Sequence, residues 1–149
     1  MNLAAILLMD EIYYIYPYFQ TTAGLSIAGE PIVEVDQNSP NSKIAEALLK
    51  ALEMSKNNVP HPVKDEWKNI AEPVLRALNV KSWNVIYKKA YYCTVVKENA
   101  VLKILPKKRG IKGFVNIKDM DDIEVDTKIS TNDLGHILVG VFDELSKLP

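Results

Sequence analysis

The feature that most constrains the fold of this chain is an internal repeat. Residues 32–52, IVEVDQNSPNSKIAEALLKAL, are matched without insertion by residues 122–142, DIEVDTKISTNDLGHILVGVF. Each segment runs from a short strand with an identical Glu-Val-Asp triplet, through a turn, into a helix with one apolar stripe. Amphipathic helices resemble one another in general, but the shared triplet at the same offset favours a true repeat. The repeat predicts two similar helices packed on one sheet.

Each repeat helix has recognisable signals in the sequence. Ser39 is the expected cap of the first helix and Pro40 its first residue, while the second is expected over residues 132–146. Leu48 and Leu138 occupy matched positions of the two apolar stripes and should both be buried. A third helical pattern covers residues 67–78, where Pro73 should kink or divide the helix.

Strand patterns account for much of the remaining chain. Residues 11–19 are rich in β-formers, and their Pro17 predicts a strand near a sheet edge or with a bulge. Residues 91–96 and 100–105 flank Lys-Glu-Asn and predict a β-hairpin. The apolar run at residues 3–9 is far shorter than the ~20 residues of a membrane span, so we assign it to the fold. We therefore predict a single α+β domain over residues 1–149, a mostly antiparallel sheet with helices packed against it.

Charge and cysteine content exclude several classes of protein. The 18 basic and 19 acidic residues give a net charge of −1, so no overall field attracts nucleic acid or a membrane surface. Cys93 is the single cysteine, so an intramolecular disulfide is impossible and a reducing cytosol is the simplest location. His61 and His136 lack metal-ligand spacing. We expect neither a metal site nor a cofactor.

One catalytic arrangement can be drawn from these residues. Cys93 with His136 and Asp133 could form a hydrolase triad. However, Cys93 lies in an alternating strand, where a lone cysteine is usually a buried apolar residue, and nothing nearby in the sequence activates it. His136 lies on the polar side of its helix. A small cytosolic hydrolase therefore remains an alternative to a binding protein.

A basic segment offers a second alternative. PKKRGIKG places Lys107, Lys108, Arg109 and Lys112 in an expected exposed loop. Its glycines do not match a phosphate-binding loop, because no helix beginning with Lys-Ser or Lys-Thr follows. A nucleic-acid-binding module that uses residues 107–112 stays possible, although the net charge does not support it.

An acidic segment directly precedes the second repeat strand. Asp119, Asp121, Asp122 and Glu124 lie within DMDDIEVD, which lacks the turn glycine and terminal glutamate of a calcium loop. Such charges can simply protect a strand edge from aggregation. Alternatively, they form an anionic patch that binds a basic partner surface.

The order of these segments resembles one protein family. LSIAGEPIVEVD, a helix ending KALEMSK, VKSWNVIYKKA, a hairpin closing LKILP, a glycine-bearing loop with GF, IEVD and LGHILVGVFDELSK resemble the immunity proteins of contact-dependent growth inhibition (CDI) systems of Gram-negative bacteria. The resemblance runs from about Tyr13 to Lys147. In that family the second helix opens with Leu-Gly, here Leu134 and Gly135. The first helix often does too, and Ile44 and Ala45 depart from that pattern here.

The resemblance implies a non-catalytic protein of the bacterial cytoplasm. It would form a heterodimer with the toxic C-terminal domain of a cognate CdiA-type effector and block it, without binding nucleic acid or membrane. Such toxins are often nucleases with basic clefts, so an acidic surface would complement them. We therefore expect Asp119, Asp121, Asp122 and Glu124 to contribute to partner binding.

Overall fold

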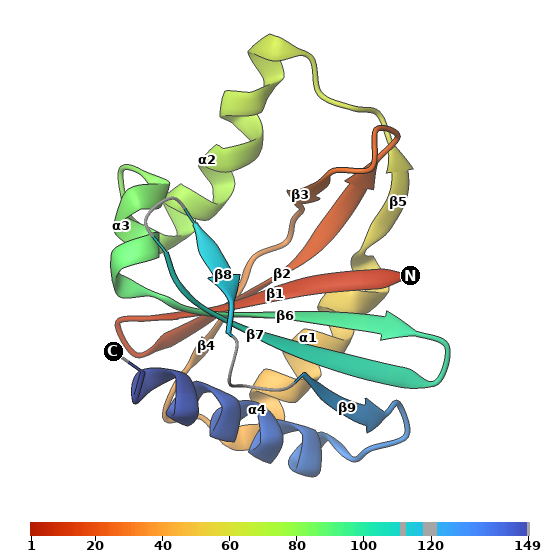
Figure 1. Ribbon diagram of the computed structural model, residues 1–149, viewed down its shortest axis with the longest axis vertical. Coiled ribbons are helices and arrows are strands. Elements are labelled where there is room, and N and C mark those ends of the chain that lie inside the picture. Colours follow the sequence, from red (N-terminus) through yellow and green to blue (C-terminus); the bar gives the residue numbers. More distant parts are fainter. Residues whose placement is uncertain (111–112, 118–121, 149) are drawn as a thin grey trace.

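A sheet lies between two layers of helices (Figure 1). The computed structural model describes residues 1–110, 113–117 and 122–148. The strands are β1 (Asn2–Met9), β2 (Ile12–Thr21), β3 (Ser26–Ala28), β4 (Val33–Asp36), β5 (Lys56–Val59), β6 (Tyr91–Glu98), β7 (Val101–Arg109), β8 (Phe114–Asn116) and β9 (Ile123–Asp126). The helices are α1 (Asn41–Met54), α2 (Trp67–Leu78), α3 (Trp83–Lys89) and α4 (Thr131–Ser146), and a 3₁₀ turn at Lys64–Glu66 precedes α2. The α+β prediction is confirmed.

The sheet is antiparallel apart from one pair in its described part. Its order is β3-β2-β1-β6-β7-β8, with β4 beside β2, β9 beside β7, and β5 parallel to β2. Residues 3–9 therefore form a central strand, which explains their apolar character. The expected position of residues 11–19 near a sheet edge is confirmed, because β2 lies next to the terminal strand β3 in this order, and it also pairs with β4 and β5. The alternative expectation of an irregularity holds, since the β2–β5 register shifts between Phe19 and Thr21.

The repeat extends beyond the strand-turn-helix segments seen in the sequence. A β-hairpin precedes each copy: β1–β2 closes at Met9 and Ile12, and β6–β7 closes at Glu98 and Val101. In each hairpin the second strand then pairs with the repeat strand, β4 or β9. Both units therefore consist of a hairpin, an outer strand and a helix.

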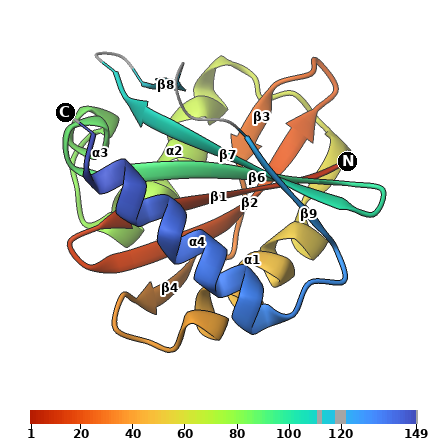
Figure 2. The ribbon, with the colours of Figure 1, turned by 60° about the horizontal axis from the view of Figure 1, so that its bottom comes forward.

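A local twofold axis relates these two units. When the hairpins are matched by register, Ala5 and Thr94 are counterparts, and they pair directly across the β1–β6 ladder. The axis passes between β1 and β6 at this pair. Figure 2 shows the consequence for the helices, because α1 and α4 lie side by side on one face of the sheet.

The turns of the two units share their hydrogen bonds. The Oδ1 atom of Asp36 accepts the Asn38 N–H at 2.8 Å, and that of Asp126 accepts the Lys128 N–H at 2.8 Å. The aspartate of each triplet thus closes the turn into the helix, which is the usual role of aspartate in this position. The shared turn explains the identical aspartate of the two triplets.

The helix caps differ between the units. Ser130 caps α4, and its hydroxyl accepts the Asp133 N–H at 3.1 Å. The expected cap at Ser39 was wrong: α1 begins at Asn41 with Pro40 as its N-cap residue. Pro40 is the repeat counterpart of Ser130, so the first unit has a proline where the second has a capping hydroxyl.

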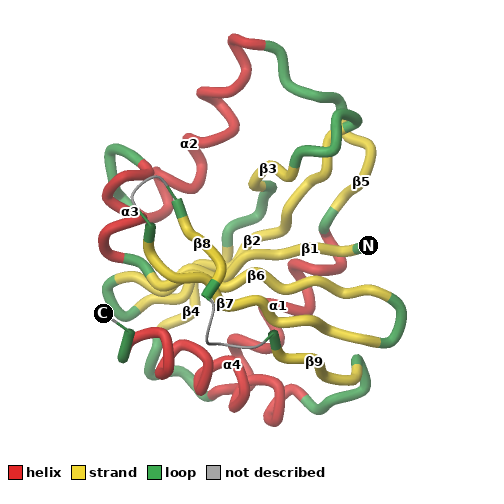
Figure 3. The backbone as a smooth tube through the Cα atoms, viewed as in Figure 1, coloured by secondary structure: helices red, strands yellow, loops and turns green. Residues whose placement is uncertain are grey.

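Both faces of the sheet are apolar, and each has its own core. Figure 3 shows helices on both sides of the strands. Leu48 of α1 and Leu138 of α4 are fully buried, as predicted, in the core between these two helices and the sheet. Val74 of α2 and Ile86 of α3 pack on the opposite face. Pro73 does not divide α2, which continues through it to Leu78.

Candidate functional site

The acidic segment is described in part. Asp119 and Asp121 lie outside the described residues, whereas Asp122 and Glu124 are exposed at the edge formed by β9. The Oε1 atom of Glu124 lies 3.7 Å from Nζ of Lys103 on β7. Both side chains are largely solvated, so this ion pair contributes only ~0–1 kcal/mol to stability. Glu124 can therefore exchange Lys103 for a cation of a partner at little cost.

Glu34 is the twofold counterpart of Glu124. It is exposed on β4, with Val33 and Val35 facing inward in the same alternation that Ile123 and Val125 show on β9. The two outer strands thus present a glutamate in equivalent positions. What distinguishes them is the run of additional aspartates before β9.

The basic segment is not a loop. Lys107, Lys108 and Arg109 are the last residues of β7 and pair with β8, and the connection between these strands begins only at Gly110. The strand was missed because its partner, β8, is three residues long and has little pattern of its own. Lys112 lies outside the described residues.

Arg109 has a structural role. Its Nη2 donates to the Lys89 carbonyl oxygen at 2.7 Å and its Nε donates to that of Ala90 at 3.0 Å, at the C-terminal end of α3. The guanidinium also lies 4.4 Å from the ring centroid of Tyr91. These contacts fix α3 to the end of β7 and hold the exposed Arg109 side chain in place.

Cys93 and His136, the nucleophile and base of the hydrolase alternative, lie in two different environments. Cys93 is fully buried in the core beneath α1 and α4, and burial raises the pKa of its thiol to about 12. His136 is exposed on α4, as the sequence predicted. A nucleophilic cysteine needs a depressed pKa and access to substrate. Cys93 instead has a raised pKa and no access to solvent.

An aromatic hollow lies on the other face of the sheet, and sequence reasoning missed it. It encloses about 340 Å³ and is lined by Tyr16, Tyr18, Ser26, Ala28, Trp83, Tyr87, Tyr92 and Phe114. These residues come from β2, β3, α3, β6 and β8, so no single stretch of sequence announces the site. The only local signal is that Tyr16 and Tyr18, two residues apart in β2, point to the same face of that strand.

Aromatic contacts hold the walls of the hollow together. Phe114 stacks on Tyr92, with ring centroids 4.6 Å apart, and meets Tyr87 edge to face at 5.4 Å. Trp83 lies 5.9 Å from Tyr87 by the same measure. At the floor the hydroxyls of Tyr18 and Tyr92 are hydrogen-bonded to each other. Burial raises the pKa of both phenols well above the ordinary value, so they remain neutral hydrogen-bonding groups.

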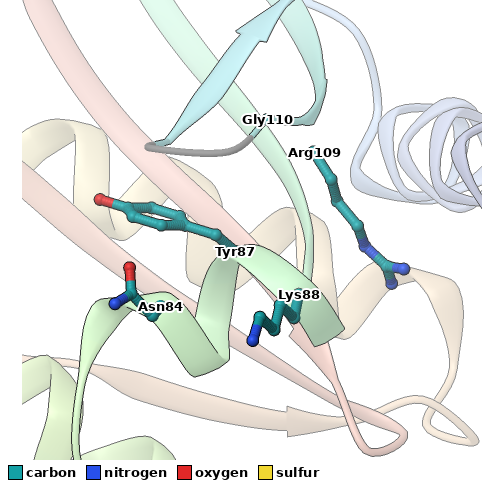
Figure 4. A pocket seen from close by; sticks show the side chains of 5 residues that line it. All are labelled: Asn84, Tyr87, Lys88, Arg109 and Gly110. Atoms are coloured by element: carbon teal, nitrogen blue, oxygen red, sulfur yellow. The ribbon is translucent and has the colours of Figure 1, made fainter.

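A second cavity adjoins the hollow at Tyr87 (Figure 4). Asn84, Tyr87 and Lys88 come from α3, while Arg109 and Gly110 come from the end of β7, and together they line about 580 Å³. Figure 4 shows the Tyr87 ring extending toward Asn84, with the Arg109 guanidinium pointing away from both. The rim of this cavity is cationic, whereas the adjacent hollow is aromatic.

Within ranges 1–110, 113–117 and 122–148, no helix has the length and apolar character needed to cross a bilayer. Over those ranges, no group of three or more potential ligand side chains is placed to hold a metal ion.

Comparison with solved structures places the fold among known proteins. A protein of unknown function from Neisseria meningitidis superposes with a TM-score of 0.74 at 16% identity, covering 96% of this chain and 94% of its own. A chain of a CdiA-CT/CdiI toxin and immunity complex from Yersinia pseudotuberculosis superposes with a TM-score of 0.73 at 12% identity, covering 95% of each chain. At these identities the likeness establishes a shared fold. No curated protein matches the sequence significantly.

The sequence itself matches the profile of one family. The profile described as CDI immunity protein aligns with residues 3–144. This range includes nearly all of the β1–β2 hairpin, the β6–β7 hairpin, α1, α4 as far as Glu144 and every residue lining the aromatic hollow. The match begins earlier than the resemblance noted above, because it also takes in β1. This chain belongs to the family of CDI immunity proteins.

Proposed function

We propose that this protein binds the C-terminal toxin domain of a cognate CdiA-type effector and neutralises it as a one-to-one, non-catalytic inhibitor in the cytoplasm of the cell that makes it. The observation that carries the proposal is the family match over residues 3–144. The superposition with a chain from a toxin and immunity complex supports it.

The side-chain environments agree with inhibition by binding. Cys93 is a buried thiol with a raised pKa, so the hydrolase alternative lacks an accessible nucleophile. Of the basic segment 107–112, Arg109 is bound to the carbonyl oxygens at the end of α3. Surface features remain: an acidic edge at β9 and an aromatic hollow with a cationic rim. Both are features by which one protein recognises another.

The toxin is a nuclease in this proposal, and the acidic edge faces its substrate cleft. A cleft that binds phosphate carries lysine or arginine, and a protein that covers it without penalty needs opposed carboxylates. Asp119, Asp121, Asp122 and Glu124 form the densest carboxylate run in the chain. These four residues are therefore assigned to the partner interface.

The test is co-expression with the cognate CdiA-type toxin domain. Wild-type protein should restore growth to cells that produce the toxin, and the two chains should co-purify as a heterodimer. The isolated toxin should degrade DNA or RNA, and one equivalent of this protein should stop the degradation. A toxin that stays active when saturated with the protein would contradict the assignment, and a toxin without nuclease activity would contradict its finer part.

A further inference from the structure

We propose that the aromatic hollow and its cationic rim form an anchor site for the toxin domain, which takes a large apolar side chain in the hollow and a neighbouring carboxylate at the rim. This inference rests on the proposed function, because it names how the same partner is held. It assigns a binding role to Trp83, Tyr87 and Lys88.

The hollow has the size and lining of a binding site. Its volume of about 340 Å³ falls at the lower end of the range of ~300–1,000 Å³ that ligand pockets occupy. Trp83, Tyr87 and Phe114 are each partly exposed around it, although aromatic side chains of this size gain most from burial. A large apolar side chain from a partner would complete their burial. Its polar end could reach the hydroxyls of Tyr18 and Tyr92 at the floor.

The rim adds charge at a defined place. Asn84, Tyr87 and Lys88 stand on one face of α3 at helical spacings of three and four residues. Lys88 is exposed and supplies the positive charge beside Asn84 and Tyr87, whereas the Arg109 guanidinium points away from those two residues and is held by the Lys89 and Ala90 carbonyl oxygens. A carboxylate is the complementary group, with the Asn84 amide and the Tyr87 hydroxyl available as further donors.

A single-stranded nucleic acid would also be attracted by aromatic and cationic groups, but the arrangement favours a protein. Bases bind by stacking on free aromatic faces. Here Tyr92 and Phe114 stack on each other, and Arg109 covers the ring of Tyr91. The exposed carboxylates of Asp122 and Glu124 lie along the same edge of the sheet and would repel a phosphate backbone.

One toxin domain can reach both the anchor site and the acidic edge. β8 pairs with residues 107–109 of β7 and β9 pairs with residues 101–104, on the same side of that strand. At ~3.3 Å per residue, Lys103 and Arg109 are about 20 Å apart. A standard interface of about 800 Å² per partner is wide enough to include both. The two surfaces thus carry opposite charges and fit a partner with a basic cleft and an acidic segment beside it.

The experiment measures the Kd of the purified cognate toxin domain for three variants of the full-length protein. Lys88→Glu reverses the rim charge at an exposed position and should raise Kd at least about tenfold. Tyr87→Ala opens the wall of the hollow and should do the same. Lys50→Glu, an exposed lysine of α1 on the opposite face, is the charge-matched control and should leave Kd unchanged. Thermal unfolding of each variant separates lost binding from lost folding, and Lys88→Glu keeps the test valid if Tyr87→Ala unfolds.

The outcomes separate this inference from the proposed function. If wild-type protein fails to bind the toxin, the proposed function fails. If wild-type protein binds and both Lys88→Glu and folded Tyr87→Ala bind equally well, the anchor site is wrong and the function stands. A larger loss with Lys50→Glu than with Lys88→Glu would place the interface on the α1–α4 face. Loss of binding to a 16-nucleotide single-stranded RNA in Lys88→Glu, with unchanged toxin affinity, would overturn the proposal in favour of a nucleic-acid site.

Discussion

Gly135 of α4 lies directly against the backbone of Asn41 at the start of α1, so closely that a Cβ atom on Gly135 would overlap the Asn41 carbonyl oxygen. The contact joins the first turns of the two repeat helices. It explains why the second helix opens with Leu-Gly. Leu134 is buried in the core, and Gly135 lacks the Cβ atom that would prevent the close approach of α1. Ala45, the counterpart of Gly135, is fully buried in α1 and shows that the twofold is approximate at this point.

Gly135→Ala should therefore destabilise the protein, despite the higher helix propensity of alanine. The methyl group must displace backbone rather than a flexible side chain, and such overpacking costs ~1–3 kcal/mol. Gly140→Ala is the matched control in the same helix. Among described residues outside its own turn, no atom lies within 4 Å of where its Cβ would stand, so this change should stabilise the protein by up to ~1 kcal/mol. Urea unfolding of both variants measures the two effects, and an equal gain in both would refute the close contact.

Leu48→Ala and Leu138→Ala should have similar costs, because the two residues are counterparts and both are fully buried. Each truncation leaves a cavity beneath its helix and should lower the free energy of unfolding by ~2–5 kcal/mol. Chemical denaturation with constant m-values measures this loss. A near-neutral effect for one of the two would show that the units are not equivalent in packing.

The Cys93 thiol should be unreactive toward a disulfide reagent at pH 8 in the native protein and fully reactive after unfolding. Burial raises its folded-state pKa to about 12, above the ordinary 9.0 of the unfolded chain. The unfolded state therefore releases this proton first as pH rises. The part of the unfolding free energy that depends on the neutral Cys93 thiol is therefore fully present below pH 9 and should be lost progressively between pH 9 and 12.

Cys93→Ala removes this thiol and its part of the pH dependence. The slope of unfolding free energy against pH above 9 should be smaller in Cys93→Ala than in wild type, while protection against the toxin is retained. Rapid labelling of the native thiol, without prior unfolding, would be inconsistent with its position in the core.

Neutralising the acidic edge should slow association with the toxin. Asp121→Asn combined with Asp122→Asn and Glu124→Gln removes charge that attracts a basic cleft, so the association rate should fall most at low salt and its salt dependence should flatten. If one carboxylate is buried and paired in the complex, its loss should instead speed dissociation and cost ~2–5 kcal/mol. Glu34→Gln is the control, because Glu34 occupies the twofold-related position on β4. Stopped-flow rates at two salt concentrations measure both steps, and unchanged rates in the triple variant would remove this edge from the interface.

Local sequence was sufficient for the elements that have a clear period or turn signal. The Glu-Val-Asp triplets, the turns at Asp36 and Asp126 and the apolar stripes around Leu48 and Leu138 are encoded within a few residues, so both repeat helices were predicted. The order of these segments also carried the resemblance to the family, because insertions that would change the spacing are absent from the matched stretches.

Tertiary structure decided what depends on partners distant in the chain. Lys107 to Arg109 became strand because β8 pairs with them. Which strands lie beside β2, namely β3 and β4, was likewise decided by pairing with distant parts of the chain. The direct pairing of Ala5 with Thr94 sets the twofold axis, which no single segment records. The aromatic hollow is assembled from five separate strands and helices, and its charged rim depends on Arg109 joining β7 to α3. Such contacts form between residues far apart in sequence, so local periodicity and propensity carry no information about which of them will meet.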